Sequence, residues 1–132
     1  MPSDSLPPQD VGASREPEHG SARAAAANAM VAIKKQFYGK GPLAAKAFFN
    51  DNYVFVVLEG GLTRNEETLL AAGEEDLVRK VRLKFQEAMT ETICGAIEDI
   101  VGRKVLTYHS QIMFEPTRTV EIFVLDGPVE QV

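Results

Sequence analysis

Two stretches of the chain contain residue types that could bind a charged ligand. One is the loop Gly39-Lys40-Gly41-Pro42, whose glycines let a ligand approach the backbone closely and whose lysine could meet an anion. The loop lacks the Gly-x-x-x-x-Gly-Lys-Ser/Thr pattern of a phosphate-binding loop, and it follows a predicted helix rather than a strand. A helix stop with chain reversal is therefore the favoured interpretation.

The other stretch is the polar side of a long predicted helix, which carries the basic residues Arg79, Lys80, Arg82 and Lys84. Acidic residues stand about one turn away on the same helix, so surface ion pairs account for much of this charge. If the loop and the helix act together, they form a site for a small anion such as a phosphate or a nucleotide, made of Lys40, Gly41, Arg79 and Arg82.

No arrangement of side chains in the sequence identifies a reaction. Cys94 is the single cysteine and lies in an apolar helical pattern, where a small buried residue is a more common role than a nucleophile. His109 is the one histidine after the first 20 residues, and no acidic residue or cysteine stands in register with it. We therefore expect a protein that is not an enzyme, with no catalytic residue, no metal site and no cofactor.

The composition argues against several classes of function. The formal net charge of −5 disfavours a general nucleic-acid binder and adsorption to an anionic membrane, since both depend on Lys and Arg. One cysteine allows no intrachain disulfide and suits a reducing cytosol. No apolar stretch approaches the roughly 18 residues of a transmembrane helix, and no secretory signal is visible. We expect a cytoplasmic protein with no nucleic-acid partner and no direct membrane insertion.

The length of 132 residues fits one domain. Residues 1–20 contain four of the seven prolines and few large aliphatic side chains, which predicts a disordered tail. Residues 21–127 form the predicted folded domain, and residues 128–132 follow it as a C-terminal tail. Ser21 is the predicted N-cap of the first helix, and Gly39 is its predicted stop.

Periodicity predicts the elements of this domain. Residues 22–37 place small and apolar side chains on one helical face, namely Ala22, Ala25, Ala26, Ala29, Met30, Ile33 and Phe37. Residues 43–50 form a strand. Residues 53–58 are apolar without alternation, so both faces of this strand should be covered or nearly so, which places it near the centre of the sheet. Residues 105–114 and 118–125 alternate and form an antiparallel hairpin.

Two predicted helices stand between the strand pairs. Thr63 and Glu66 match the capping box that begins a short helix, and the charged residues there are interpreted as a cap with a solvated face. The next helix keeps its apolar spacing over about 38 Å, at roughly 1.5 Å per residue. That length exceeds what one small domain covers, so part of the apolar stripe should face a second copy. The predicted dimer interface comprises Met89, Ile93, Ile97, Ala25 and Ala29.

The element order α-β-β-α-α-β-β predicts an α+β fold, with a mainly antiparallel sheet of about four strands and helices on one face. This order invites comparison with a KH-type RNA-binding module. The loop between the paired helices, Ala72-Gly73-Glu74-Glu75, is acidic and has no Gly-x-x-Gly clamp. The RNA-binding interpretation is therefore rejected.

Several motifs together resemble one small bacterial family. They are Gly39-Lys40-Gly41-Pro42, Val57-Leu58-Glu59-Gly60-Gly61-Leu62-Thr63, Val78-Arg79-Lys80-Val81-Arg82, Phe85-Gln86-Glu87-Ala88-Met89, Glu98-Asp99-Ile100-Val101-Gly102-Arg103-Lys104-Val105 and Glu121-Ile122-Phe123-Val124-Leu125. The chain resembles the MpsC-like family, formerly a domain of unknown function and named after a sodium-translocating, membrane-potential-generating system of which it is the soluble component. The resemblance covers about residues 22–126. Tyr108-His109-Ser110-Gln111 departs from a Ser-Asp pair of the family, and the family supplies no catalytic residue to carry over.

The resemblance and the overlong helix imply a non-enzymatic accessory or regulatory protein of a bacterial ion or inorganic-carbon transport system. We expect it to act as a homodimer, with membrane transport subunits as further partners. The alternative is a sensor for a small anionic ligand held by Lys40, Arg79 and Arg82. An enzyme ranks below both, since the sequence shows no nucleophile–base pair and no paired carboxylates in a forced geometry.

Overall fold

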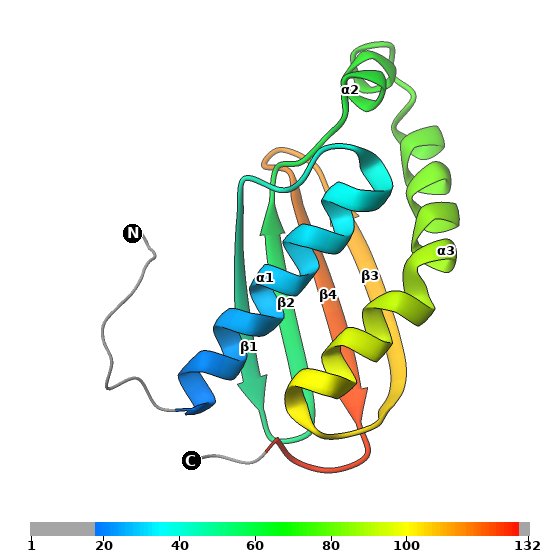
Figure 1. Ribbon diagram of the computed structural model, residues 1–132. Helices are drawn as coiled ribbons and strands as arrows, with labels where there is room; N and C mark the ends of the chain where they lie inside the picture. Colours follow the sequence, from blue (N-terminus) through cyan, green and yellow to red (C-terminus); the bar gives the residue numbers. More distant parts are fainter. Residues whose placement is uncertain (1–17, 130–132) are drawn as a thin grey trace.

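A computed structural model describes residues 18–129 of the chain. The elements are α1 (Glu18–Tyr38), β1 (Ala44–Asn50), β2 (Tyr53–Glu59), α2 (Arg64–Ala71), α3 (Glu75–Val101), β3 (Val105–Met113) and β4 (Arg118–Leu125). The predicted α+β class and the element order α-β-β-α-α-β-β are confirmed (Figure 1).

Both ends of the folded domain lie further out than the sequence predicts. α1 begins at Glu18, so Ser21 lies inside the helix and is not its N-cap. At the other end, Val129 is buried in the core, and its N–H donates to the Asp51 carbonyl oxygen at 2.9 Å. Of the two predicted tails, residues 1–17 and 130–132 lie outside the described part of the chain.

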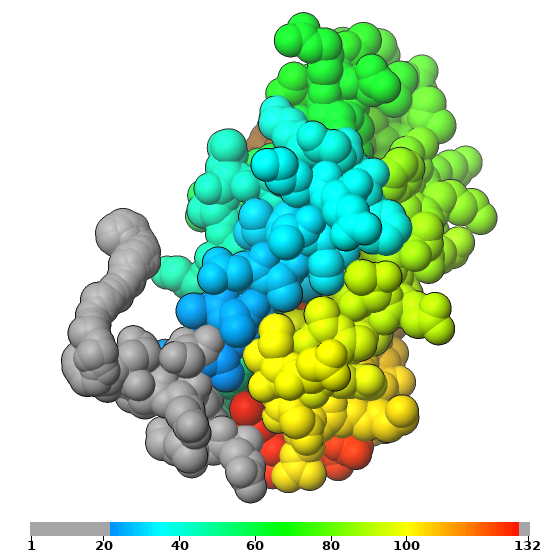
Figure 2. All heavy atoms as spheres, in the orientation of Figure 1, coloured from blue at the N-terminus to red at the C-terminus, as the bar shows by residue number. Residues whose placement is uncertain are grey.

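The four strands form one antiparallel sheet in the order β1-β2-β4-β3. The two hairpins lie side by side through β2 and β4, whose register pairs Val56 with Glu121. The helices α1 and α3 contact each other and lie across one face of the sheet, as Figure 2 shows. The core therefore lies between these two helices and that face.

β2 is central in the sheet, as predicted, but only one of its faces is covered. Val54, Val56 and Leu58 are buried against the helices, whereas Tyr53 on the opposite face is 42% exposed. The prediction that both faces would be covered is wrong, because α1 and α3 lie on the same side of the sheet (Figure 1). An antiparallel sheet tolerates this arrangement, since its second face can meet water.

The apolar face of α3 fills the core of its own domain. Met89, Ile93 and Ile97 are fully buried in one cluster with residues of α1 and the sheet. The predicted dimer contacts at these three residues are therefore wrong, because the side chains already occupy the space between the helices and the strands. Ala25 and Ala29, the other two predicted contacts, are half-buried on α1.

α3 is longer than the sheet that it crosses. Its 27 residues span about 40 Å at roughly 1.5 Å per residue, and its N-terminal half begins beyond the ends of the strands, next to α2 (Figure 1). Among the described elements, α2 contacts α3 alone. In this half Leu77, Val81 and Leu83 are 41%, 37% and 51% exposed. The surplus apolar surface of α3 thus lies in its N-terminal half rather than at the predicted positions.

Candidate functional site

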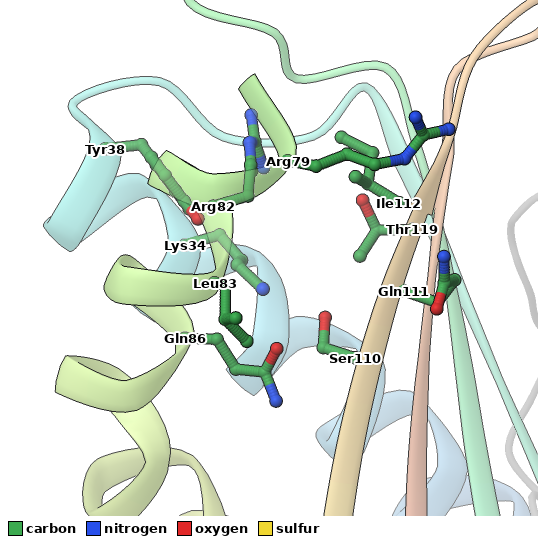
Figure 3. Close-up of a pocket in the computed structure, with 10 residues that line it drawn as sticks. All are labelled: Lys34, Tyr38, Arg79, Arg82, Leu83, Gln86, Ser110, Gln111, Ile112 and Thr119. Atoms are coloured by element: carbon green, nitrogen blue, oxygen red, sulfur yellow. The ribbon is translucent and has the colours of Figure 1, made fainter. Parts of the chain in front are cut away.

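A cavity of about 180 Å³ lies between α3, the end of α1 and the hairpin of β3 and β4 (Figure 3). Three of the side chains that line it are cationic, and none of the lining side chains is a carboxylate. The polar lining includes Lys34, Arg79, Arg82, Gln86, Ser110 and Thr119. The cavity therefore combines positive charge with open space.

Lys34 and Glu121 form a buried ion pair at the inner end of this region. Their side chains are 5% and 0% exposed, and Lys34 Nζ lies 3.0 Å from Glu121 Oε2. Lys34 follows Ile33 on the buried side of α1, and Glu121 shares the inner face of β4 with Phe123. A pair buried this deeply needs further hydrogen bonds to offset the loss of hydration.

Two hydroxyl groups of β3 supply those hydrogen bonds. Ser110 Oγ donates to Glu121 Oε2 at 2.9 Å, and the Tyr108 hydroxyl donates to Oε1. The strand register makes this possible, because Ser110 pairs with Glu121 and Tyr108 pairs with Phe123 on the same face. Burial, and then the negative charge of Glu121, raises the pKa of Tyr108, so its hydroxyl remains a donor.

Arg82 is held by a second buried carboxylate, that of Glu66. Arg82 Nε lies 2.6 Å from Glu66 Oε2, and Nη2 lies 2.6 Å from Oε1. Nη2 also donates to the Gly61 carbonyl oxygen at 3.2 Å, and the guanidinium lies 4.1 Å from the centroid of the Tyr38 ring. Arg82 thus joins α1, α2 and the loop after β2 to α3, and most of its donors are already used.

Glu66 also completes the predicted capping box of α2. The Thr63 N–H donates to Glu66 Oε1 at 2.9 Å, and the Glu66 N–H donates to Thr63 Oγ1 at 3.2 Å. Burial by itself would raise the pKa of Glu66, but hydrogen bonds from Arg82 and Thr63 outweigh it and lower that pKa below its usual value. The capping box is confirmed, whereas a solvated face is the wrong description for Glu66, which is 6% exposed.

The structure divides the four residues of the predicted anion site. Arg79 and Arg82 line the cavity, whereas Lys40 and Gly41 are not among its lining residues. Lys40 is exposed in the loop after α1. Gly39 has a φ of +80°, and its N–H donates to a carbonyl oxygen in the last turn of α1 at 2.8 Å. The helix-stop interpretation of this loop is therefore confirmed.

Arg79 is the more available of the two arginines in the cavity wall. Its ion pair with Glu75 has an N–O distance of 3.2 Å, and the two side chains are 39% and 54% exposed. The guanidinium also lies over the ring of Phe114, 5.0 Å from its centroid. An exposed pair of this kind contributes little to stability, so the charge of Arg79 remains available to attract an anion.

The anion site predicted from the sequence does not include Lys34, Glu121 or Thr119. The sequence does contain a signal for Lys34 and Glu121. Lys34 interrupts the apolar spacing of α1 directly after Ile33, and Glu121 occupies an inward position of β4 that alternates with Phe123. A charged residue at an apolar position of a periodic pattern must find a partner, because burial without one is unfavourable. Which partner it finds depends on the tertiary fold.

The remaining reactive residues lie apart from the cavity. His109 is exposed on the outer face of the sheet, with its Nε2 3.3 Å from Thr107 Oγ1. Cys94 is half-buried on α3, and burial raises the pKa of its thiol. Within residues 18–129, no three His, Cys, Asp or Glu side chains gather as a metal site. No helix in that range is long and apolar enough to cross a membrane.

Comparison with known proteins gives the family of the chain. The family model described as "Na+-translocating membrane potential-generating system (MpsC)" matches residues 18–127. The chain is also similar to the "Uncharacterized protein YrhF" of Bacillus subtilis (strain 168), with 25% identity over 101 residues that cover 75% of this chain and 83% of that protein. No solved structure matches. Since the family match spans nearly all of the described residues, the chain belongs to the MpsC family.

Proposed function

We propose that the chain is a non-enzymatic accessory component of a bacterial Na+-translocating, membrane-potential-generating system, and that it supports ion or inorganic-carbon transport from the cytoplasm. The family match over residues 18–127 carries this proposal. The two buried carboxylates of the described domain support the non-enzymatic part of the proposal, because Glu121 is paired with Lys34 and Glu66 is paired with Arg82. These pairs give the carboxylates a structural role.

We propose that the homodimer forms through the outer face of the sheet, which a second copy of the chain covers. Phe48, Phe55 and Ile122 lie side by side there in the register of three neighbouring strands. Phe48 and the nearby Tyr53 are 46% and 42% exposed. A contiguous exposed apolar surface is typical of a protein interface, and two sheets pack face to face at about 10 Å. This surface replaces the buried α3 residues as the proposed dimer contact.

Sedimentation velocity at micromolar concentration tests the homodimer. We expect the wild-type chain to sediment as a dimer and Phe55→Lys to sediment as a folded monomer with an unchanged far-UV circular dichroism spectrum. Val81→Lys, which alters an exposed residue of α3, is the matched control and should remain dimeric. Loss of the dimer in the control but not in Phe55→Lys would move the interface to α3. A wild-type monomer would remove the homodimer from the proposal.

A deletion strain of the native bacterium tests the role in membrane-potential generation. We expect deletion to lower the membrane potential in sodium-containing medium, as measured with a potential-sensitive dye, and the wild-type chain to restore it. Affinity purification from detergent-solubilised membranes should recover integral transport subunits with the wild-type chain. An unchanged potential in the deletion strain, together with no membrane subunit recovered above an untagged control, would overturn the assignment.

A further inference from the structure

The cavity between α3 and the β3–β4 hairpin contains hydrogen-bonding groups that the fold leaves unused. Thr119 lines the cavity, is 4% exposed, and its hydroxyl has no hydrogen-bond partner among the described residues. The Lys34 ammonium has three N–H donors; within residues 18–129 it forms an ion pair with the Glu121 carboxylate and lies 6.0 Å from the centroid of the Tyr38 ring, which leaves donors for a ligand. Buried donors normally find acceptors, because leaving one without a partner costs about 1–3 kcal/mol. These groups therefore indicate a binding site.

The polar groups of the cavity come together from four different elements, and among them the Ser110 hydroxyl already donates to Glu121, so that it offers a ligand only its oxygen. Lys34 of α1, Gln86 of α3 and Ser110 of β3 point toward one another across the cavity (Figure 3). The Thr119 hydroxyl of β4 lies on the same side of the strands, on the face that the helices cover. Donors predominate in this set, since a lysine has no acceptor and an amide contributes two N–H groups. An acceptor-rich ligand fits this arrangement.

The charges favour an anion as that ligand. Lys34, Arg79 and Arg82 line the cavity, whereas their partner carboxylates do not. The remaining wall includes the apolar side chains of Leu83 and Ile112. A ligand with a negatively charged end and an apolar body would therefore contact complementary groups on both sides.

The volume limits the size of the ligand. The cavity measures about 180 Å³. A buried apolar cavity of about 150 Å³ holds benzene, and pockets for drug-sized ligands measure about 300–1,000 Å³. A nucleotide exceeds this volume, whereas a carboxylate on a small ring or a short chain fits within it.

We propose that this cavity binds a small organic carboxylate, with the carboxylate on Lys34 Nζ and the Thr119 hydroxyl and the apolar body against Leu83 and Ile112. Arg79, on the more exposed side, attracts the negative charge. This site differs from the small-anion site predicted from the sequence, because Lys34 and Thr119 replace the glycine-rich loop as the binding residues. The site does not depend on the proposed role in membrane-potential generation.

Benzoate is a suitable probe, because it joins one carboxylate to a ring of the size that the cavity admits. We expect millimolar benzoate to shift the NMR amide resonances around Thr119, Ser110 and Leu83 in isotope-labelled full-length chain. Benzyl alcohol, a neutral analogue, should leave these resonances in place. Equal shifts with benzyl alcohol, or no shift with either benzoate or inorganic phosphate, would overturn the anion site. Shifts with inorganic phosphate and none with benzoate would overturn the assignment to an organic carboxylate.

Variants test the placement of the carboxylate. Thr119→Val keeps the shape of the side chain and removes the unpartnered hydroxyl, so it should weaken benzoate binding about tenfold with no loss of thermal stability. Lys34→Met/Glu121→Gln, which removes both charges of the buried pair together, should abolish the benzoate shifts. Lys40→Ala is the control and should bind benzoate as the wild type does. Unchanged binding in Thr119→Val, or lost binding in Lys40→Ala, would contradict this placement.

Discussion

At the scale of single residues, the charged groups inside the domain are organised as two buried ion pairs. Lys34 with Glu121 lies beneath the helices in the core, and Arg82 with Glu66 lies where α2 meets α3. Each carboxylate also accepts hydrogen bonds from neighbouring groups, so the loss of hydration on burial is offset. The two pairs lead to different predictions, one for mutation and one for pH.

Removal of one charge of the core pair should destabilise the domain. Lys34→Met leaves the Glu121 carboxylate without its cation, and we expect a loss of about 3–5 kcal/mol in the free energy of unfolding. Lys34→Met/Glu121→Gln should recover most of this loss, because no charge is left without a partner, the amide oxygen still accepts from one hydroxyl of β3, and the amide N–H can donate to the other. Urea unfolding at neutral pH measures both variants.

The control for this prediction is Lys84→Met, which breaks an exposed pair with Glu87. The N–O distance of that pair is 3.7 Å, and its side chains are 80% and 60% exposed. The change in the free energy of unfolding should stay within about 0.5 kcal/mol. A double variant as unstable as Lys34→Met alone would show that an unpaired buried charge is not the cause of the loss.

Glu66 makes part of the stability depend on pH. Its pKa in the folded state is lowered from the usual 4.5, since hydrogen bonds from Arg82 and Thr63 outweigh burial. A lowered folded-state pKa means that this contribution is fully present above pH 4.5 and is lost as the pH falls through the folded-state pKa. The stability difference between wild type and Glu66→Gln should therefore shrink below pH 4.5.

Urea unfolding at a series of pH values measures this difference. Glu67→Gln, an exposed neighbour in the same turn of α2, is the control. A difference between wild type and Glu66→Gln that stays constant across the acid range would contradict the role given to the Glu66 carboxylate.

At the scale of elements, α2 depends on few contacts. Among the described elements it contacts α3 alone, and it lies beyond the ends of the strands. The ion pair between Arg82 and Glu66 and the capping box of Thr63 are the polar contacts that hold it (bonds of 2.6–3.2 Å). Elements with few buried contacts open locally before the core does.

Loss of the cap should loosen α2 first. Thr63→Ala removes the Oγ1 acceptor of the capping box, and we expect a loss of about 1 kcal/mol in helix stability. Hydrogen exchange followed by mass spectrometry should show faster exchange in α2 and little change in the C-terminal half of α3. Thr68→Ala, whose hydroxyl bonds within the helix at 3.0 Å, is the control and should leave exchange in α2 unchanged or slower. Equal acceleration in α2 and in the core of α3 would contradict local opening.

At the scale of the whole molecule, the sheet has one covered and one open face. The helices bury the inward positions of the strands, while the outward positions include Phe48, Tyr53 and Phe55. Tyr53 and Phe55 stack with their ring centroids 6.1 Å apart. A second copy on this face would remove these rings from water, which is the basis of the proposed homodimer.

A homodimer formed through this face should make thermal stability depend on concentration. Association stabilises the folded state by mass action, so the Tm of the wild-type chain should rise with protein concentration. The Tm of Phe55→Lys should not change with concentration. Differential scanning calorimetry over a hundredfold range of concentration measures both. A wild-type Tm that is independent of concentration would contradict the dimer.

The sequence by itself determined the elements, their order and the local devices that begin and end them. The capping box of Thr63 with Glu66 and the stop at Gly39 are short-range features, because each depends on residues within about one helical turn. Apolar periodicity predicted the helices and strands for the same reason. The motifs along residues 39–125 also pointed to the family that the comparison then gave.

Only the tertiary structure decided which side chains share a site and which surfaces remain open. Glu66 and Arg82 stand 16 residues apart in the chain, and Lys34 meets Glu121 across the core, so no local pattern specifies either pair. The apolar run of β2 resembled a strand covered on both faces, because periodicity records hydrophobicity and not the position of the helices. The same limit explains α3: its stripe was correctly recognised as apolar, but the packing of α1 and the sheet determined that Met89 lies in the core.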